Sequence, residues 1–216
     1  AGVPVRFLRR FVGGIGVLIG LLLANVLFAP EKYQIVEDYQ RHRLLVYFGQ
    51  DFAPQDATPA ERKKLRQLER AKSYNVEQAL ISVGPGGLTG KGWQQGTQNT
   101  LGYLPRAVAH NDFIFSVLAE EKGFLGSVMV LILYSTVLFC GIKIASQARD
   151  RLGKLLAVGV VTMLFSHIFI NIGMNIRLMP VTGIPLPLLS YGGSSVLCSL
   201  VAIGILQNVY IYRRSY

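Results

Sequence analysis

Three carboxylates stand at the start of a long apolar run, in the stretch AVAHNDFIFSVLAEEKGFLG. Asp112 follows His110 and Asn111 and precedes a helical pattern, so one role open to it is that of a helix N-cap. The other role is chemical. A helix dipole keeps a carboxylate at the helix N-terminus ionised, and an ionised carboxylate within hydrogen-bond distance of a hydroxyl can act as a general base.

Glu120 and Glu121 lie two turns further along, about 12 Å from Asp112 on a helix axis. Charged side chains at such a position are costly against lipid and usually face a cavity or a partner. Lys122 follows directly and could partly neutralise them. We therefore interpret this pair as cavity or salt-bridge residues rather than as the reactive group.

The segments that must position these residues are those of a membrane protein. The chain has 216 residues, 51% of them hydrophobic, and a mean hydropathy of +0.39. Four apolar windows, at about 11–29, 124–144, 155–176 and 196–212, are close to the roughly 20 residues that cross a bilayer as a helix. They predict an all-α polytopic membrane protein with transmembrane helices at about 11–29, 113–144, 155–176 and 196–212. The second span would be about 50 Å long from Asp112, so it must tilt, extend above the membrane or break near Gly123 and Gly126.

Positive charges flank these windows on one side. The net charge is +10, and four crossings would put all the short basic clusters at the same face, which the positive-inside rule assigns to the cytoplasm. Both ends of the chain are therefore predicted to be cytoplasmic, and we see no nucleic-acid signal. The clusters are Arg6, Arg9 and Arg10; Lys143, Arg149, Arg151 and Lys154; and Arg213 and Arg214. Cys140 and Cys198, inside spans, are expected to be buried small hydrophobes.

This orientation makes residues 30–111 a large extracytoplasmic loop. Within it we expect an amphipathic segment at 33–48, a polar helix at 59–73 and a short helix at 74–83 that ends at GlyProGlyGly. The glycine-rich run GPGGLTGKGWQQGTQNTLG then follows, and its spacing fits no nucleotide-binding loop. Two interpretations stay open for this run: a flexible connector, or a close-fitting backbone surface that meets a ligand, with its glutamine and asparagine amides suited to sugar hydroxyls.

The segment 177–195 is the second outer loop, LMPVTGIPLPLLSYGGSS preceded by Arg177. It contains three prolines and is still apolar. Non-helical backbone at membrane depth requires burial in protein or a wet cavity, so we predict a re-entrant loop whose hydroxyls and free amides face a ligand. The alternative is a plain proline-rich turn.

Three stretches resemble the SEDS family (shape, elongation, division and sporulation): GGLTGKGWQQGTQ, HNDFIFSVLAEEKGFLG and NIGMNIRLMPVTGIPLPLLSYGGSS. The QGTQ sequence at 95–98 favours the RodA type over the FtsW type. The resemblance covers nearly all of this chain but only the C-terminal part of the family. It implies that residues 1–216 are the C-terminal part of one SEDS-type membrane domain, and that this part makes no polymer by itself.

The resemblance implies a peptidoglycan glycosyltransferase that polymerises lipid II, an undecaprenyl diphosphate-linked disaccharide peptide, for cell elongation and shape. It would act at the outer face of the bacterial cytoplasmic membrane with a class B penicillin-binding transpeptidase. The essential aspartate of the family falls on Asp112, which would take the proton of the acceptor sugar hydroxyl. The diphosphate leaving group calls for cationic help, from side chains or a divalent cation. The substrate-binding candidates are Lys91, Gln95, Thr97, Gln98, His110, Arg177, Ser190, Tyr191, Gly192 and Gly193.

Some residues depart from the family pattern. Arg106 stands where a glutamate is common, Asn111 replaces a threonine, and Arg177 occupies a position where a small residue is expected. Two other functions remain open beside the enzyme. A lipid II flippase or transporter would also use interrupted helices and intramembrane carboxylates, and a scaffold would mainly hold a transpeptidase.

Overall fold

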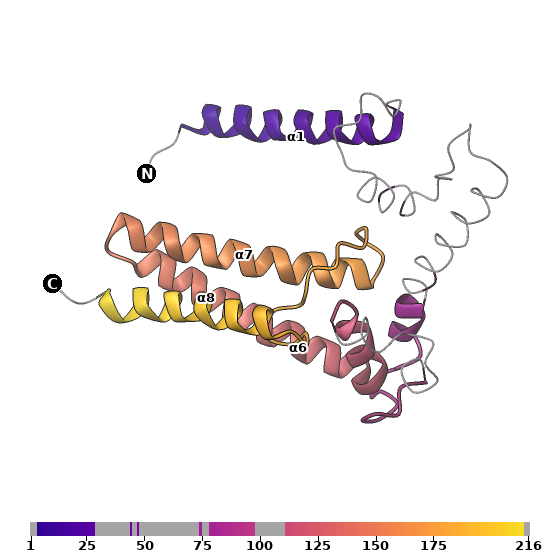
Figure 1. Cartoon of the computed structure of the whole chain (residues 1–216). Helices are drawn as coiled ribbons and strands as arrows, with labels where there is room; N and C mark the ends of the chain where they lie inside the picture. The colour runs from indigo at the N-terminus through magenta and orange to yellow at the C-terminus, as the bar shows by residue number, and fades with distance from the viewer. Residues whose placement is uncertain are drawn as a thin grey trace. The chain divides into compact units, whose positions relative to one another are not determined.

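The computed structural model describes residues 4–28, 44, 47, 74, 78–97 and 111–213. Its long elements are the helices α1 (Val5–Phe28), α6 (Ile114–Gln147), α7 (Arg151–Asn175) and α8 (Gly193–Tyr212), shown in Figure 1. Each overlaps one predicted window, so the helical fold class is confirmed, and the described residues contain no strand. Residues 78–83 are helical, and this helix ends at Gly84, as predicted. The segments predicted at 33–48 and 59–73 lie outside the described residues, apart from residues 44 and 47.

Helices α6, α7 and α8 are long and apolar enough to cross a membrane, and they are the three such helices in the searched part of the chain. Large apolar side chains such as Leu133, Leu155 and Leu200 are exposed along them. A water-soluble bundle would bury such a surface, whereas lipid accepts it. The chain is therefore a membrane protein. The 24-residue helix α1 belongs to a separate unit, residues 1–67, while the other three helices belong to residues 68–216.

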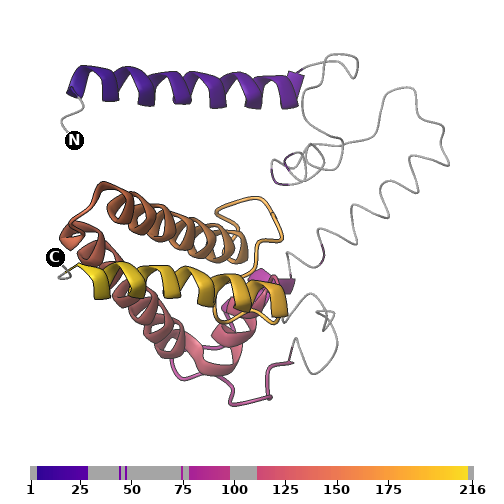
Figure 2. The ribbon, with the colours of Figure 1, turned by 60° about the vertical axis from the view of Figure 1, so that its left-hand side comes forward.

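Helices α6, α7 and α8 pack on one another in an up-down-up arrangement (Figure 2). The turn from α6 to α7 is short because Asp150 ends it as an N-cap, its carboxylate accepting a hydrogen bond of 2.7 Å from the Gly153 amide. Near this turn, Ala145, Ala157 and Leu206 form an apolar core. The Arg213 guanidinium also contacts the Gln147 side chain here, so the C-terminus of α8 lies at this end.

The opposite end carries the N-terminus of α6, the C-terminus of α7 and the loop 176–192, which we call the outer loop. A second core joins them there, built from Phe115, Tyr134, Ile168 and Leu186. Leu186 is fully buried although it lies in a loop without regular structure. The outer loop is thus packed into the bundle rather than extended away from it.

Helix α6 is broken at Gly123, which was one of the three alternatives that the sequence left open for this long span. Gly123 has φ 66° and ψ −163°, a backbone conformation that glycine adopts readily and other residues avoid. The break separates a short N-terminal piece, 114–122, from the long remainder, and the chain changes direction there (Figure 2). Asp112 therefore precedes a short helical piece rather than one straight span.

The expectation that both cysteines are buried is wrong for this chain. Cys140 and Cys198 are free and exposed. They lie on faces of α6 and α8 that point away from the core that these helices share with α7. Inside a span, such faces meet lipid or further helices, so an apolar position in the sequence did not require burial within these three helices.

Candidate functional site

Asp112 lies immediately before the first turn of α6, and its main chain is held from α7. The N-cap residue of the helix is Phe113, so the N-cap role considered for Asp112 is wrong by one position. The Asp112 carbonyl accepts hydrogen bonds from the side-chain amides of Asn171 and Asn175, at 3.0 and 3.2 Å. One Asp112 carboxylate oxygen lies 3.7 Å from the point where Gly183 would carry a Cβ. The carboxylate therefore stands beside the outer loop.

Asn171 and Asn175 tie three segments together, and both are fully buried. The Asn171 amide also donates to the Ile184 carbonyl at 2.8 Å. The Asn175 side-chain oxygen accepts from the Ser116 hydroxyl at 2.6 Å and from its backbone amide at 3.3 Å. The pair thus connects α7 to the start of α6 and to the outer loop.

The outer loop is also fastened to α6 directly. The Ser190 hydroxyl donates to the Asn111 carbonyl at 2.6 Å and accepts from the Leu186 amide at 2.7 Å. The Tyr134 hydroxyl donates to the Pro187 carbonyl at 2.6 Å. Tyr134 lies about 16 Å along α6 from the break, so the Pro187 carbonyl is held against the side of this helix.

A cavity of about 1050 Å³ opens beside this loop. Its walls are the end of the outer loop, the first turns of α8 and Ile114 of α6. The lining is mainly apolar, which suits a hydrocarbon chain better than a sugar. Four of the predicted substrate-binding residues lie here together, and Tyr191 is 81% exposed. They are Ser190, Tyr191, Gly192 and Gly193.

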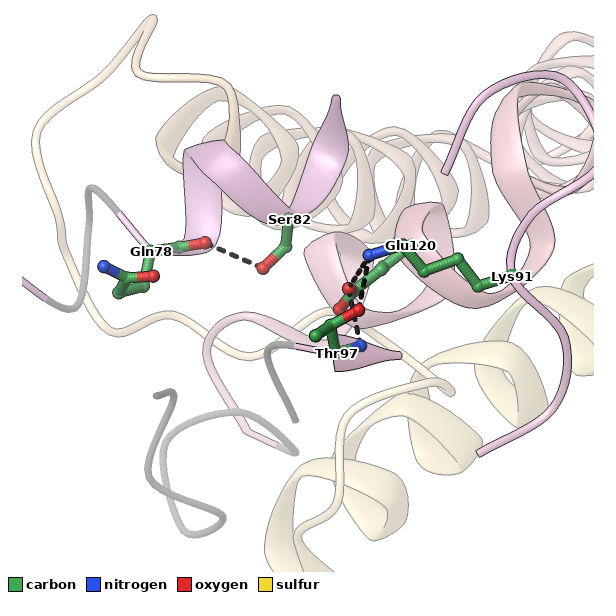
Figure 3. Close-up of polar contacts among 5 residues, drawn as sticks. All are labelled: Gln78, Ser82, Lys91, Thr97 and Glu120. Atoms are coloured by element: carbon green, nitrogen blue, oxygen red, sulfur yellow. Dashed lines mark hydrogen bonds and ion pairs between the residues drawn. The ribbon is translucent and has the colours of Figure 1, made fainter. Parts of the chain in front are cut away.

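Glu120 sits in a second polar cluster, shown in Figure 3. Its carboxylate forms an ion pair with the Lys91 ammonium at 2.7 Å and accepts from the Thr97 backbone amide at 2.8 Å. Lys91 also donates to the Thr97 hydroxyl at 2.7 Å. The carboxylate is 1% exposed and the lysine 29%. The predicted salt bridge is confirmed, but its cation is Lys91 from the glycine-rich run.

Lys122, the partner that the sequence suggested, does not neutralise Glu120. Its ammonium lies 4.9 Å from the centre of the Trp93 ring and is engaged in a cation–π contact. Successive helical residues point about 100° apart, so Lys122 faces away from Glu120. Glu121 is buried and has no ion pair in the described part of the chain.

The glycine-rich loop, residues 84–97, completes the hydrogen bonding of the broken helix. In a regular helix the amides of Phe124 and Leu125 would donate to the carbonyls of Glu120 and Glu121. Here those amides donate instead to the carbonyls of residues 87 and 88, at 2.8 and 3.1 Å. The freed carbonyls accept from the amides of residues 91 and 92, each at 3.1 Å. Four loop bonds replace two helical ones, which satisfies the backbone groups that the break exposes.

These bonds argue against a flexible connector for residues 84–97. The run is a close-fitting backbone surface there, but what it meets is the break in α6, and contact with a ligand stays a prediction. A Cβ at Gly90 would lie 2.1 Å from the Glu121 carbonyl oxygen, and one at Gly123 would lie 2.3 Å from the Gly90 nitrogen. Real Cβ atoms do not approach so closely, so these glycines are required by contact distance.

The remaining predicted residues are distributed as follows. Lys91 and Thr97 are engaged with Glu120, so the charge of Lys91 is compensated within the protein. Gln95 is exposed on the glycine-rich loop. Arg177 is exposed at the end of α7, with φ 59°, at the same end of the bundle as Asp112. Gln98 and His110 lie outside the described residues. Among the described side chains, no group of three or more His, Cys, Asp or Glu could hold a metal ion.

Asn171 and Asn175 were not among the predicted site residues, although the sequence carries a signal for them. They are two amides one helical turn apart in a mainly apolar span, and polar groups inside a span usually have a bonding partner. The sequence shows this spacing, but it does not show that the partner is the Asp112 carbonyl.

Comparison with known proteins agrees with these features. Residues 3–215 match the sequence model of the FtsW/RodA/SpoVE family, described as cell cycle proteins. The peptidoglycan glycosyltransferase MrdB of Escherichia coli K12 is 36% identical over 218 aligned residues, which cover 99% of this chain and 53% of MrdB. Stage V sporulation protein E of Bacillus subtilis 168 is 48% identical over 141 residues, covering 65% of this chain and 38% of that protein. The chain thus spans about half the length of these curated relatives, or less.

A solved structure is similar as well. A chain in a peptidoglycan synthase complex, studied for the coordination of polymerization and crosslinking, matches with a TM-score of 0.67 at 26% identity. The match covers 96% of this chain and 50% of that one.

Proposed function

The chain belongs to the FtsW/RodA/SpoVE family, and on this premise we propose that it is the C-terminal part of a peptidoglycan glycosyltransferase that polymerises lipid II. The observation that carries the proposal is the position of Asp112. Its main chain is fixed by two buried amides, its carboxylate borders the outer loop, and an apolar cavity begins two residues away at Ile114. A lipid-linked sugar needs this combination of a polar group beside an apolar groove.

In the proposed reaction, the Asp112 carboxylate takes the proton of the acceptor sugar hydroxyl. The hydroxyl oxygen forms a bond to the anomeric carbon of the donor, and the bond from that carbon to the diphosphate oxygen breaks. The electron pair of that bond leaves with undecaprenyl diphosphate. The carboxylate needs hydrogen-bond distance to the hydroxyl for this step, and the bonds to its main chain restrict where it can stand.

The cavity beside the outer loop would take part of the undecaprenyl chain. Its lining is mainly apolar, and Tyr191 at its edge is exposed for contact with a headgroup. Arg177, at the same end of the bundle, is a candidate cation for the diphosphate. Lys91 is a weaker candidate, because Glu120 already compensates its charge.

We propose four spans, with α1 as the first and with residues 30–111 and 177–195 outside the membrane or re-entrant from the outer side. The basic side chains near the turn between α6 and α7 support a cytoplasmic position for that end. Asp112 lies at the opposite end, where lipid II would present its sugars. The buried Leu186 and the bond from Tyr134 support a re-entrant outer loop, because they hold proline-rich backbone inside the bundle.

The proposed partner is a class B penicillin-binding transpeptidase, which would crosslink the strands that this enzyme makes. The similar solved chain comes from a peptidoglycan synthase complex, and this supports a partnered polymerase over a solitary one. A lipid II flippase would instead require carboxylates that act on the substrate along the membrane. The pairing of Glu120 with Lys91 and Thr97 supports a structural role for that residue.

The test is polymerisation of purified lipid II by a protein of the relatives' full length that carries this chain. Asp112→Asn and Asp112→Ala should abolish glycan strands, since asparagine and alanine accept no proton, while the amount of folded protein stays unchanged. Asp150→Asn is the matched control, because Asp150 also precedes a helix but lies at the opposite end. It should retain activity. Wild-type polymer from Asp112→Asn would refute the role of Asp112, and lipid II translocation without polymer would favour the flippase.

A further inference from the structure

Helix α7 buries two asparagine side chains that share one hydrogen-bond acceptor. Burying two side-chain amides in an apolar helix is costly unless each finds hydrogen-bond partners. A leucine at either position would avoid burying an amide, but it would leave the Asp112 carbonyl with one donor fewer. Asn171 and Asn175 are nevertheless fully buried, and both direct an N–H to the same atom, the carbonyl oxygen of Asp112.

The bonds from the two asparagines reach Asp112 at a point where the regular bonding of α6 has not yet begun. The helix starts after it, with Phe113 as N-cap, so the Asp112 main chain lies outside the regular helical bonding. Two side-chain amides fix its carbonyl instead. Fixing this peptide restricts the direction of the Cα–Cβ bond, which in turn restricts the volume that the carboxylate can reach.

Asn171 also positions the outer loop beside the Asp112 carboxylate. Its amide bridges the carbonyls of Asp112 and Ile184, at 3.0 and 2.8 Å. Ile184 follows Gly183, whose Cα faces the carboxylate closely enough that an added Cβ would lie 3.7 Å from its oxygen. One side chain therefore fixes the gap between the carboxylate-bearing segment and the outer loop.

We propose that Asn171 and Asn175 are positioning residues that hold the Asp112 carboxylate at its reactive place. This proposal rests on the proposed function of Asp112. The asparagines touch no reacting atom and act through the Asp112 main chain, so their loss should lower the turnover number more than the affinity for lipid II. A displacement of about 1 Å at a reacting group can reduce the rate roughly 100-fold.

The decisive variants are Asn171→Asp and Asn175→Asp, in the full-length protein with lipid II as substrate. Aspartate has nearly the shape of asparagine, but when ionised it has no proton to donate to the Asp112 carbonyl, and when protonated it has one O–H in place of two N–H groups. We expect kcat per folded molecule to fall roughly 10- to 100-fold, with KM changed by less than about threefold because the lipid-binding surfaces are intact. If the aspartate variants do not fold, Asn171→Ser and Asn175→Ser carry the same expectation.

Two controls separate positioning from general destabilisation. Gly141→Ala places a Cβ 2.5 Å from Val161 at the far end of the bundle, so it should lower thermal stability and leave kcat per folded molecule within about twofold. Asn208→Asp makes the same chemical change on exposed α8 surface and should do the same or less. If the asparagine variants lose no more kcat than Gly141→Ala at comparable stability, the positioning role is refuted.

Asp112→Asn, measured in parallel, distinguishes a failure of the proposed positioning role from a failure of the proposed catalytic role. If Asp112→Asn is inactive and Asn171→Asp keeps the wild-type kcat, only the positioning role falls. If Asp112→Asn itself keeps wild-type activity, the catalytic role of Asp112 falls and the positioning role falls with it.

Discussion

Replacing Gly90 with alanine should detach the glycine-rich loop from the break in α6. The added Cβ would lie 2.1 Å from the Glu121 carbonyl oxygen and 2.7 Å from the Gly123 nitrogen. Both are backbone atoms of the helix, so no side-chain rotation can relieve the contact. The loop must move away, and the bonds on either side of Gly90 must lengthen or break.

The size of the effect follows from two contributions. Gly90 has φ 81°, and a residue with a Cβ in this left-handed region costs about 1–2 kcal/mol. Movement of the loop also removes at least the bonds donated by the amides of residues 91 and 92, worth together about 1–3 kcal/mol. Gly90→Ala should therefore cost about 2–5 kcal/mol in local stability.

Gly87→Ala is the matched control for this prediction. Gly87 also has a left-handed φ, 56°, but a Cβ there would meet nothing within 4 Å. The control carries the conformational cost without the collision, so the two variants should differ by about 1–3 kcal/mol, which corresponds to a ratio of roughly 5 to 150 in the opening equilibrium.

Hydrogen–deuterium exchange in lipid nanodiscs measures this opening directly. The amides of residues 91, 92, 124 and 125 should exchange faster in Gly90→Ala than in Gly87→Ala by that ratio, while amides in the centre of α7 stay protected in both. Equal protection of the four amides in the two variants would show that these four backbone bonds do not hold the glycine-rich loop on α6.

Two further predictions concern side chains that fasten the same end of the bundle. Combining Lys91→Met with Glu120→Gln in a double-mutant cycle should give a coupling free energy on the order of 1–2 kcal/mol in thermal unfolding. Combining Lys91→Met with Glu121→Gln, which has no ion pair among the described residues, should give a smaller coupling, and a coupling of zero for the first pair would contradict the ion pair. Tyr134→Phe should cost about 1–3 kcal/mol because it leaves a buried loop carbonyl without its donor, while Tyr191→Phe, at an 81% exposed position, should change stability by less than about 0.5 kcal/mol. Equal effects of the two tyrosine variants would argue against the Tyr134 bond.

The sequence predicted the elements well because the membrane imposes a simple pattern. Long apolar windows predicted the helices, and the excess length of one span, together with its two glycines, made a break near Gly123 one of three alternatives. These are local signals. A short stretch of sequence is enough to show where a helix lies in the chain and where glycine or proline can interrupt it.

The pairings were harder to predict because they join distant segments. Lys122 is next to Glu121 in the sequence, yet helical geometry turns it toward Trp93, and the cation that reaches Glu120 comes from residue 91. Likewise the glycines of the loop could be recognised as close-contact residues, but their partner surface, the break in α6, could not. Apolar character also failed to predict burial of the two cysteines, since lipid and protein interiors favour the same side chains.

The short piece of α6 from 114 to 122 shows why these long-range contacts matter for function. A helix of two and a half turns is unstable by itself, because nucleation is costly and few bonds repay it. Here both ends are fixed from outside. The asparagine pair and Ser190 hold the N-terminal end, at Asn111 and Asp112. The glycine-rich loop holds the C-terminal end through Lys91 and the two backbone bonds that the carbonyls of residues 120 and 121 accept. A carboxylate mounted on a long continuous span would move with every tilt of that span. The break at Gly123 interrupts the helical bonds between this piece and the remainder of α6. The contacts at the N-terminal end tie Asp112 and Asn111 to α7 and to the outer loop. We therefore expect substitutions at either end of this piece to lower kcat, but those at the asparagine end to do so with the smaller loss of stability.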